Sequence, residues 1–591
     1  MANLWWQMLA YRVLQADTAA IMYLMSTKVR SGNKAYEYLS LVEGYRDETG
    51  KSRQRTLFRL GEASRLRESG ELDRIVEALT AHAERRWVDV DDLEAEGAPA
   101  IGGIAAVKTW WDRLGLNSFF DEAGRRLSWS LNDAVFAMTT NRLLDPASKR
   151  KTVRWIEQDV VAPEGFSFPT LEQYYRALDR VHDLKSELET FLYAQLTDLT
   201  NLTLTLACFD LTSTYLEGSV APSVTFPSKA FGHSRDRRAD RPQVVVGLLM
   251  TGDGIPIAHQ VFAGDTSDVT TLPEVLEDLQ RRFAVGKICL VADRGLISET
   301  NIDTVEGAGY DWLIATKLRN RTDVTQVLAL AQAADEDDWV EVDRFNSKVL
   351  DLDHDGRRYI VVFSNARQRR DTLRRLQLIK KVEDKLLALE RRIDRGELTD
   401  RDAMIAAAEK ILHRSPVRRL FTYQISHGRL VYDYDHDALA YEEVLAGHYI
   451  LATSLDRTTH DAGEVLACYR TLEKIEALFR VLKDFLHLRP IRHWTETRVR
   501  GHIAICVLAC VIEALLAKTL ADADVRDPDL DNQHLTPRRA LEELGRIRQV
   551  TLTPGDGPPI DVVTRRTTLQ QQILDALEVD TRDWQRPTIH S

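Results

Sequence analysis

The stretch from residue 202 to residue 316 constrains the fold most, because its apolar side chains recur with two different periods in a fixed order. Alternating apolar residues predict strands, and apolar residues three or four apart predict helices. The Gly-Asp-Gly sequence at 252–254 predicts a tight turn between two of the strands. The predicted elements are, in order, strands at 202–210, 243–251 and 255–263, a helix at 272–283, a strand that ends at Asp293, a second helix, and a strand at 312–316.

Three strands in a meander, followed by helix, strand, helix and strand, form the order of a ribonuclease-H-like fold. We therefore expect an α/β fold with a ribonuclease-H-like catalytic core. Such a core carries one acid on its first strand and a second at the carboxyl end of its fourth strand, where active sites gather in open sheets. Asp210 and Asp293 occupy these two places. Each alone also fits an ordinary turn or helix cap, so the hypothesis needs a third acid.

The candidate for the third acid is Glu476, in a segment from Val465 to Lys483 that has a helical period. Apolar residues recur there at spacings of three, four and seven, as in a helix with one buried face. Tyr469, Glu476 and Lys483 fall within about 40° of one line along that helix. The alternative is an ion pair between Glu476 and Arg480 on a solvated face, but the apolar neighbours of Glu476 argue against full exposure.

These motifs resemble the bacterial insertion-sequence DDE transposases of the YREK-motif superfamily, whose third acid lies in a Y-x2-R-x3-E-x6-K motif. Tyr469, Glu476 and Lys483 match that spacing. Leu472 stands where the motif has arginine, and this departure is typical of a large branch that reads Y-x-x-L-x-x-I-E-x-x-F-R-x-L-K. Other segments that resemble the same branch are Asn141–Lys149, D-L-T-S-T-Y at 210–215, Gly232–Gln243, Phe262–Asp268 and Arg489–Trp494.

The resemblance implies a DNA transposase that moves an insertion sequence by a cut-and-paste route. In this family a homodimer binds terminal inverted repeats on double-stranded DNA, cleaves there, and joins the ends to target DNA. Asp210, Asp293 and Glu476 would be the catalytic residues and the metal ligands. Two Mg²⁺ ions would be the cofactors, with Mn²⁺ able to substitute. Carboxylate oxygens suit these hard cations, and two cations stabilise the attacking and leaving oxygens of phosphodiester transfer.

The resemblance also assigns contacts with DNA. Tyr469, Arg480 and Lys483 would contact the backbone beside the scissile phosphate. Arg235 and Arg241 belong to a basic cluster between the first two strands. Such a cluster either contacts phosphates or is solvated surface, and its place in a family motif favours phosphate contact.

The long interval between Asp293 and Glu476 predicts an insertion domain at 320–445. By resemblance this insertion is β-rich and shelters the cleaved DNA end. Trp339 is the candidate for stacking against a flipped base, although a core tryptophan explains it as well. A charged helical stretch from Arg367 to Arg395 is either a salt-bridged solvated helix or a DNA-binding arm.

Apolar patterning divides the rest of the chain. A basic-edged hairpin is expected around the turn Asp47–Gly50, and an N-terminal helical module follows from the helical period after Gly103. The predicted domains are an upstream extension at 1–24, a hairpin and helical region at 25–100, the helical module at 101–201, the first part of the core at 202–319, the insertion at 320–445, the second part of the core at 446–520, and a C-terminal helical region at 521–591. The basic edge of the region 25–100 is either a contact with DNA or a solvated strand face.

Composition limits the classes of function. The net charge of −12 excludes a globally basic nucleic-acid binder, so contacts with DNA must come from local basic patches. Five cysteines without C-x-x-C pairing predict a protein of the reducing cytoplasm, at the nucleoid when bound to DNA. Glu513 and Lys518 interrupt the apolar run 503–520, which predicts a buried helix and no membrane span.

Two other functions fit the same residues. The first is a nuclease of the same fold that cuts DNA without joining it. The second is a catalytically silent DNA-binding protein derived from a transposase. The three acids count against the second alternative, whereas the departure at Leu472 keeps it open.

Overall fold

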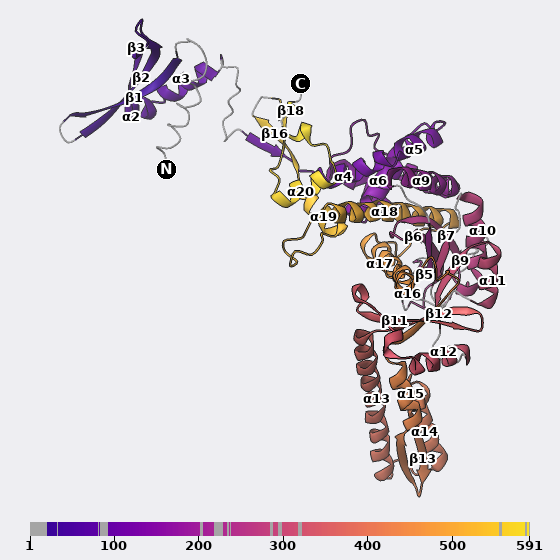
Figure 1. The fold of residues 1–591 in the computed structure, drawn as a ribbon. Coiled ribbons are helices and arrows are strands. Elements are labelled where there is room, and N and C mark those ends of the chain that lie inside the picture. Colours follow the sequence, from indigo (N-terminus) through magenta and orange to yellow (C-terminus); the bar gives the residue numbers. More distant parts are fainter. Residues whose placement is uncertain are drawn as a thin grey trace. The chain divides into compact units, whose positions relative to one another are not determined.

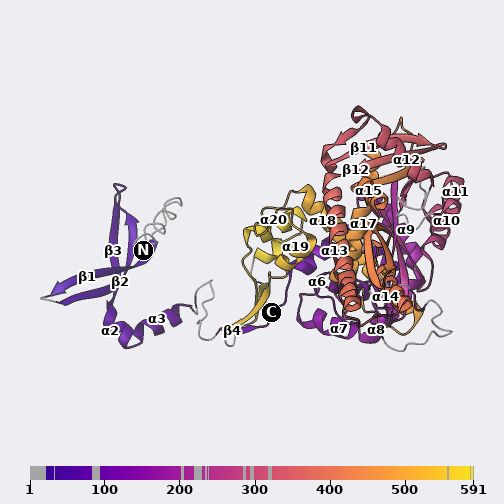
Figure 2. The same ribbon diagram turned by 90° about the horizontal axis from the view of Figure 1, so that it is seen from below.

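The structure is a computed structural model, and the contacts divide the chain into two units. One unit comprises 1–95, 552–559 and 590–591, and the other comprises 96–551 and 560–589. Figures 1 and 2 show both units as ribbons. The residues that the structure describes are 21–31, 34–80, 82, 93–200, 205–217, 229–232, 236, 238–283, 288–292, 298–316, 322–554, 558–585 and 588–589.

The first unit consists of three antiparallel strands followed by two short helices. They are β1 (Ile21–Ser31), β2 (Lys34–Arg46), β3 (Ser52–Glu62), α2 (Ala63–Glu68) and α3 (Glu71–Thr80). Ile21 pairs with Gly44, so residues 21–24, which the sequence assigns to an upstream extension, belong to β1. The predicted hairpin is confirmed, because β2 and β3 pair across the turn at 47–50.

A layer of helices opens the second unit, as the sequence predicts for its N-terminal module. These helices are α4 (Gly102–Arg113), α5 (Leu116–Gly124), α6 (Leu131–Leu144), α7 (Lys149–Gln158), α8 (Leu171–Asp183) and α9 (Lys185–Thr200). Local chemistry sets their starts. The Thr170 side chain caps α8 by accepting a hydrogen bond from the Gln173 amide, and the Gln173 side chain accepts one from the Thr170 amide. Strand β4 (Leu93–Glu96) precedes this layer.

A nine-stranded sheet forms the centre of the second unit, in the order β10-β11-β12-β15-β9-β8-β5-β6-β7. Its first five strands in the chain are β5 (Leu206–Tyr215), β6 (Gln243–Thr251), β7 (Pro256–Ala263), β8 (Cys289–Ala292) and β9 (Asp311–Ala315). Strands β5, β6 and β7 form an antiparallel meander, and β8 and β9 run parallel to β5. This is the strand order predicted from the sequence, and the fold is mixed α/β.

The two faces of this sheet pack against different helices (Figure 1). Alternate residues of β5 show the division, because Cys208 belongs to one hydrophobic core and Phe209 to another. The core around Phe209 includes α10 (Leu272–Arg282), α11 (Glu299–Gly307) and α12 (Thr322–Ala333). The core around Cys208 includes the helical layer and the helices that follow the insertion.

The insertion contains more helix than strand, which differs from the β-rich domain expected by resemblance. Its further elements are β10 (Val340–Val342), β11 (Ser347–His354), β12 (Arg357–Phe363), α13 (Asn365–Asp394), α14 (Arg401–His413), β13 (Phe421–Ser426), β14 (Arg429–Tyr434) and α15 (His436–Leu445). Strands β10 to β12 join the central sheet, because β12 pairs with β15 (His448–Thr453), which pairs with β9. The rest packs around a separate core between α13, α14 and the β13–β14 hairpin.

The segment 465–483, predicted as one helix, is divided in the structure. It forms α16 (Ala462–Arg470), α17 (Leu472–Arg480) and a π-helical turn, η6 (Val481–Phe485). The division falls at Thr471, whose hydroxyl donates to the Cys468 carbonyl at 2.6 Å. A threonine hydroxyl that bonds the preceding turn competes with the helical hydrogen-bond ladder.

The remaining elements are α18 (Glu496–Asp522), α19 (Pro537–Leu544), β16 (Gln549–Pro554), β17 (Ile560–Val563), α20 (Thr568–Ala576) and β18 (Thr588–Ile589). Helix α18 is long and apolar enough to cross a membrane, but 78% of its most apolar window is buried inside the protein. It packs against α6, α8 and β7, as a core helix does. The predicted buried helix is therefore confirmed.

Candidate active site

Asp210 lies half-buried on β5, which is flanked in the sheet by β8 and β6. Its carboxylate accepts a hydrogen bond from the Leu211 amide at 2.7 Å. Two residues earlier on the same face, Cys208 Sγ lies 2.8 Å from Thr471 Oγ1, at the start of α17. Burial raises the pKa of Cys208 to about 11, so its thiol stays protonated at neutral pH. Asp210 is thus the ionisable group on the β5 face that α17 covers.

Strand β8 runs beside β5 and ends next to Asp210. Ala292, its last residue, is in register with Phe209, the residue before Asp210. Asp293 follows Ala292 in the chain and lies outside the described residues. Phe209 and Ala292 are therefore neighbours on two parallel strands, and each is followed in the chain by one of the two predicted acids.

Glu476 is exposed on α17, whereas Ile475 and Phe479 beside it are buried. Within the described part of the chain Glu476 makes no hydrogen bond or ion pair. The alternative ion pair with Arg480 is thus not formed, and Glu476 is exposed although its neighbours Ile475 and Phe479 are buried, as the sequence predicts for a helix with one buried face.

Lys474 holds one flank of α17 against the turn between β6 and β7. Lys474 Nζ donates to the Gly252 carbonyl at 2.7 Å, in the turn between β6 and β7. Glu476 is two residues further on, about 200° around the helix. Glu476 therefore lies on the flank of α17 away from Lys474, and α17 itself packs against β5, the strand of Asp210.

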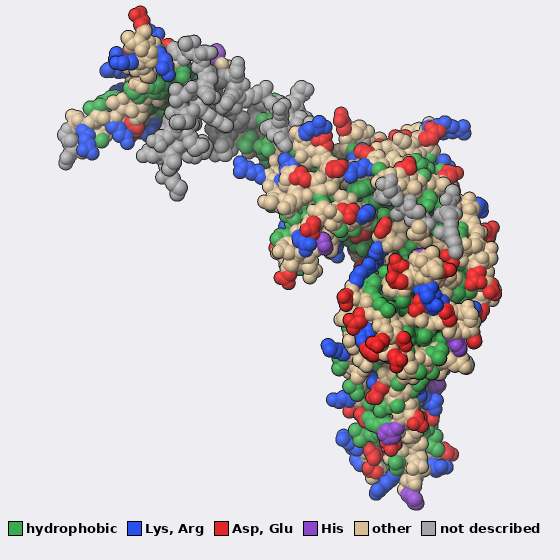
Figure 3. All heavy atoms as spheres, in the orientation of Figure 1, with side chains coloured by type: hydrophobic (Ala, Val, Ile, Leu, Met, Phe, Trp, Pro, Cys, Tyr) green, Lys and Arg blue, Asp and Glu red, His purple; other side chains and the backbone are tan. Residues whose placement is uncertain are grey.

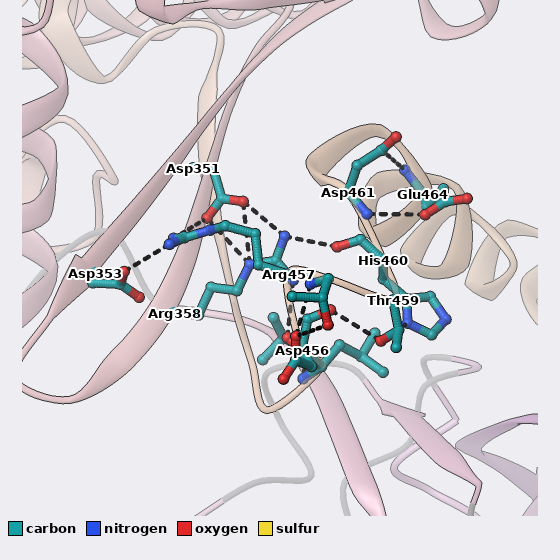
Figure 4. A network of polar contacts seen from close by, with 12 residues as sticks. Asp351, Asp353, Arg358, Asp456, Arg457, Thr459, His460, Asp461 and Glu464 are labelled. Carbon is teal, nitrogen blue, oxygen red and sulfur yellow. Dashed lines mark hydrogen bonds and ion pairs between the residues drawn. The ribbon is translucent and has the colours of Figure 1, made fainter.

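The chain before α16 is held by a buried arginine (Figure 4). Arg358 on β12 donates to Asp351 on β11 at 2.7 Å, and to the carbonyls of Leu455 and His460 at 2.9 Å each. Arg457 also binds Asp351, at 2.7 Å. Burial alone raises the pKa of the Asp351 carboxyl, but hydrogen bonds from both arginines lower it overall. These bonds fix the loop from which the helices of the site start.

Lys483 is held by an acid that the sequence analysis did not single out. Its Nζ lies 2.9 Å from Asp236 Oδ1, and the two side chains are only 11% and 6% exposed. Arg489 binds the same Asp236 oxygen, and it also binds Asp484 at 2.8 Å. The signal for this site in the sequence is the single acid within the arginine cluster 235–238.

The other predicted DNA contacts lie at separate places. Arg480 is exposed and, in the described part of the chain, has no ion pair. Tyr469 is half-buried beside Tyr449, with ring centroids 6.1 Å apart. Arg241 lies 3.5 Å from Asp240, and Arg235 is outside the described residues.

Trp339 lies half-buried at the margin of the core around Phe209. Its ring meets His448 edge-on, with centroids 6.3 Å apart. This packing is that of a tryptophan at the edge of a core.

The donor set suits a hard divalent cation. Asp210 and Glu476 supply carboxylate oxygens, and the nearby thiol of Cys208 stays neutral, which disfavours soft-metal binding. The described residues contain no group of three or more His, Cys, Asp or Glu side chains placed to hold a metal. Asp293, the third member of the predicted set, is outside these residues.

Comparisons with known proteins identify the family of the chain. Residues 206–512 match the family described as "Transposase DDE domain", and residues 24–94 match "IS1634 family transposase, N-terminal domain". A segment of 98 residues is 36% identical to "Putative transposase InsL for insertion sequence element IS186A" of Escherichia coli K12, covering 17% of this chain and 23% of that protein. The same figures hold for the "Transposase for insertion sequence element IS421" of Escherichia coli.

The chain thus spans about a quarter of the length of these relatives. Among solved structures, "Mos1 transposase paired-end complex with left transposon end" aligns with 33% of this chain and 69% of that chain, at 11% identity and a TM-score of 0.14. A likeness at that score carries no argument. The match to the DDE domain, however, covers more than half of the chain, so the protein belongs to the family of DDE-domain transposases.

Proposed function

We propose that the protein cleaves DNA at the terminal inverted repeats of an insertion sequence and joins the ends to target DNA by a cut-and-paste route. The observation that carries the proposal is that β8 ends in register with the residue before Asp210 on β5, while α17, the helix of Glu476, packs against β5. The match to the DDE domain supports the same chemistry. We infer from the Y-x-x-L-x-x-I-E-x-x-F-R-x-L-K spacing that the chain belongs to the large branch of the YREK superfamily.

Asp210, Asp293 and Glu476 would hold two Mg²⁺ ions, and Mn²⁺ would substitute. When bound, the ions lower the pKa of an attacking hydroxyl and stabilise charge on the leaving oxygen. The Leu211 amide holds one Asp210 oxygen at 2.7 Å, which fixes the orientation of that carboxylate. Glu476 needs to break no ion pair with the described residues before it binds a cation. Close carboxylates repel one another until cations bind.

The basic residues around α17 would bind the DNA backbone. Arg480 is exposed, so its guanidinium is accessible to a phosphate of the DNA. Lys483 shares Asp236 with Arg489, so a phosphate that binds Lys483 must replace or join that carboxylate. Arg235 and Arg241 would extend the contact through their cluster, and Tyr469 would add a hydroxyl. The protein would act as a homodimer on double-stranded DNA in the bacterial cytoplasm.

The test uses purified full-length protein and linear DNA that carries the inverted repeats found beside the coding region. We expect nicking and joining in Mg²⁺ or Mn²⁺ and none in EDTA. Loss of a residue that only supports a metal ligand lowers activity about 10- to 100-fold. Asp210→Asn, Asp293→Asn and Glu476→Gln each remove a predicted ligand, so each should lower the cleavage rate by more than this. DNA binding should persist in all three variants.

Glu473→Gln is the matched control, because Glu473 is an exposed acid on the same helix and pairs with Arg470. It should cleave at the wild-type rate. Cleavage without joined products would favour the nuclease alternative. DNA binding without any cleavage would favour the silent DNA-binding protein. Equal activity of Glu476→Gln and Glu473→Gln would refute the assignment of the third acid.

A further inference from the structure

Helix α13 carries a line of positive charge along its exposed side. Its basic residues recur at spacings of three, four and seven, which places them on one face of a helix. At about 100° per residue, the central four of these residues lie within about 60° of one another. The residues of this basic stripe are Arg367, Arg370, Arg374, Lys381, Lys385 and Arg392.

The central cations of the basic stripe are not neutralised by the protein. Arg370, Arg374, Lys381 and Lys385 are all exposed and, in the described part of the chain, form no ion pair. Within the described part of the chain the stripe forms ion pairs only towards its ends, where Arg367 lies 3.7 Å from Asp371 and Arg392 lies 3.5 Å from Glu397. Asp384, between Lys381 and Lys385 in the sequence, is exposed and forms no ion pair with either of them. Like charges at i and i+4 repel each other, so this pattern is unfavourable for an isolated helix.

The opposite face of α13 is fixed to the protein. Ile379, Val382 and Leu386 are buried in the core shared with α14 and the β13–β14 hairpin. Arg375 is buried too, and it donates to the Glu442 carbonyl at 2.7 Å. The basic stripe therefore points to solvent on a rigid support. Figure 3 shows Lys and Arg side chains along the edge where Figure 1 draws α13.

The start of α13 is also connected to the helices of the candidate active site. The Arg367 guanidinium lies 4.8 Å from the centre of the Tyr449 ring. Tyr449 in turn packs against Tyr469 on α16, and Arg470 lies 6.0 Å from the same Tyr449 ring. The contacts thus run without a break from the basic stripe to the helix that precedes α17.

We propose that the basic stripe of α13 binds the phosphate backbone of duplex DNA next to the segment that is cleaved. This inference rests on the proposed function for the identity of the DNA. Cations one turn apart lie about 6 Å from each other, and duplex DNA offers a continuous row of negative charge to such a line. The chain has a net charge of −12, so its attraction for a polyanion must come from a local row of cations such as the basic stripe. The contact would be independent of base sequence.

The test measures binding of a fluorescent duplex without inverted repeats, in the full chain with Asp210→Asn to prevent cleavage. The stripe variant is Arg370→Gln/Arg374→Gln/Lys381→Gln. We expect its dissociation constant to rise at least tenfold at moderate salt. We also expect the slope of log K against log salt to fall by about 2.7, which is about 0.9 for each lost phosphate contact.

The matched control is Arg369→Gln/Lys380→Gln/Arg391→Gln. It removes the same number of arginines and lysines from exposed positions of α13, eleven residues apart on another side of the helix. It should change the salt slope by less than one. Equal effects of the two triple variants, or no effect of the stripe variant, would overturn the proposal. So would a stripe variant that loses self-association in sedimentation while it binds DNA normally, because the stripe would then contact a second copy of the chain.

Circular dichroism of both variants should match the parent, since all six side chains are exposed. Failure of the proposed function is distinguishable from failure of this inference. A wild-type protein that never cleaves DNA would refute the former, whereas the binding comparison is made without cleavage and would still decide the latter.

Discussion

Lys149 is a buried cation without a hydrogen-bond partner. Its side chain is 4% exposed at the first position of α7, and its Nζ bonds to no described group. Burial and, to a smaller extent, the Arg142 guanidinium lower the pKa of Lys149 from 10.5 to about 7, although Cys506 opposes the change. A cation at a helix N-terminus also meets the positive end of the helix dipole. Lys149 should therefore weaken the fold.

The size of this penalty depends on pH. Below pH 7 the amine is protonated in both the folded and the unfolded chain, so the whole penalty applies. As pH rises from 7 to 10.5 only the unfolded chain stays protonated, and the penalty shrinks. With about 1.4 kcal/mol for each pKa unit, the amine lowers the free energy of unfolding by about 4 kcal/mol at pH 7 and about 2 kcal/mol at pH 9.

We therefore expect Lys149→Met, which keeps the chain length and removes the charge, to raise the free energy of unfolding by about 4 kcal/mol at pH 7 and about 2 kcal/mol at pH 9. Urea unfolding at both pH values measures this. Trp111 and Trp155 are buried in the same helical layer, so tryptophan fluorescence reports on it.

The control is Lys151→Met, because Lys151 is exposed on the same helix and should change the transition little at either pH. The reasoning would be refuted if the difference in free energy of unfolding between wild type and Lys149→Met were the same at pH 7 and pH 9. A Lys149→Met protein that is less stable than wild type at both values would refute it too.

Two further ion pairs give predictions of the opposite sign. Burial alone would raise the pKa of Glu189, but His259, Lys185 and Arg282 lower it to about 2. Glu189→Gln should therefore lower the free energy of unfolding by about 3 kcal/mol at pH 7. In wild type this stabilisation should disappear as pH falls from 4.5 to 2, because the carboxylate is then protonated. Acid unfolding followed by circular dichroism measures both effects. Asp236→Asn leaves Lys483 and Arg489 without their shared carboxylate, so it should lower the free energy of unfolding in urea by about 3 kcal/mol. An unchanged midpoint of urea unfolding would contradict this contact.

The sequence by itself determined the local elements and the identity of the chemical groups. The period of apolar residues gave the strands of the meander, the buried helix α18 and the long helix α13, because period follows from the hydrogen-bond geometry of each element. Caps such as Thr536 before α19 were also local, since a hydroxyl satisfies an amide three residues away. Asp210 and Glu476 were identifiable because residue type and spacing are properties of the chain.

Only the tertiary structure decided which partners these groups meet. It divided the helix at Thr471, exposed Glu476, and gave Lys483 the carboxylate of Asp236, far away in sequence. It also joined β10, β11 and β12 to the central sheet, although the sequence predicted a separate insertion domain. The physical reason is that strand pairing, burial and ion pairing depend on distances in space between remote segments, and the period of one segment contains no information about which other segment will cover it.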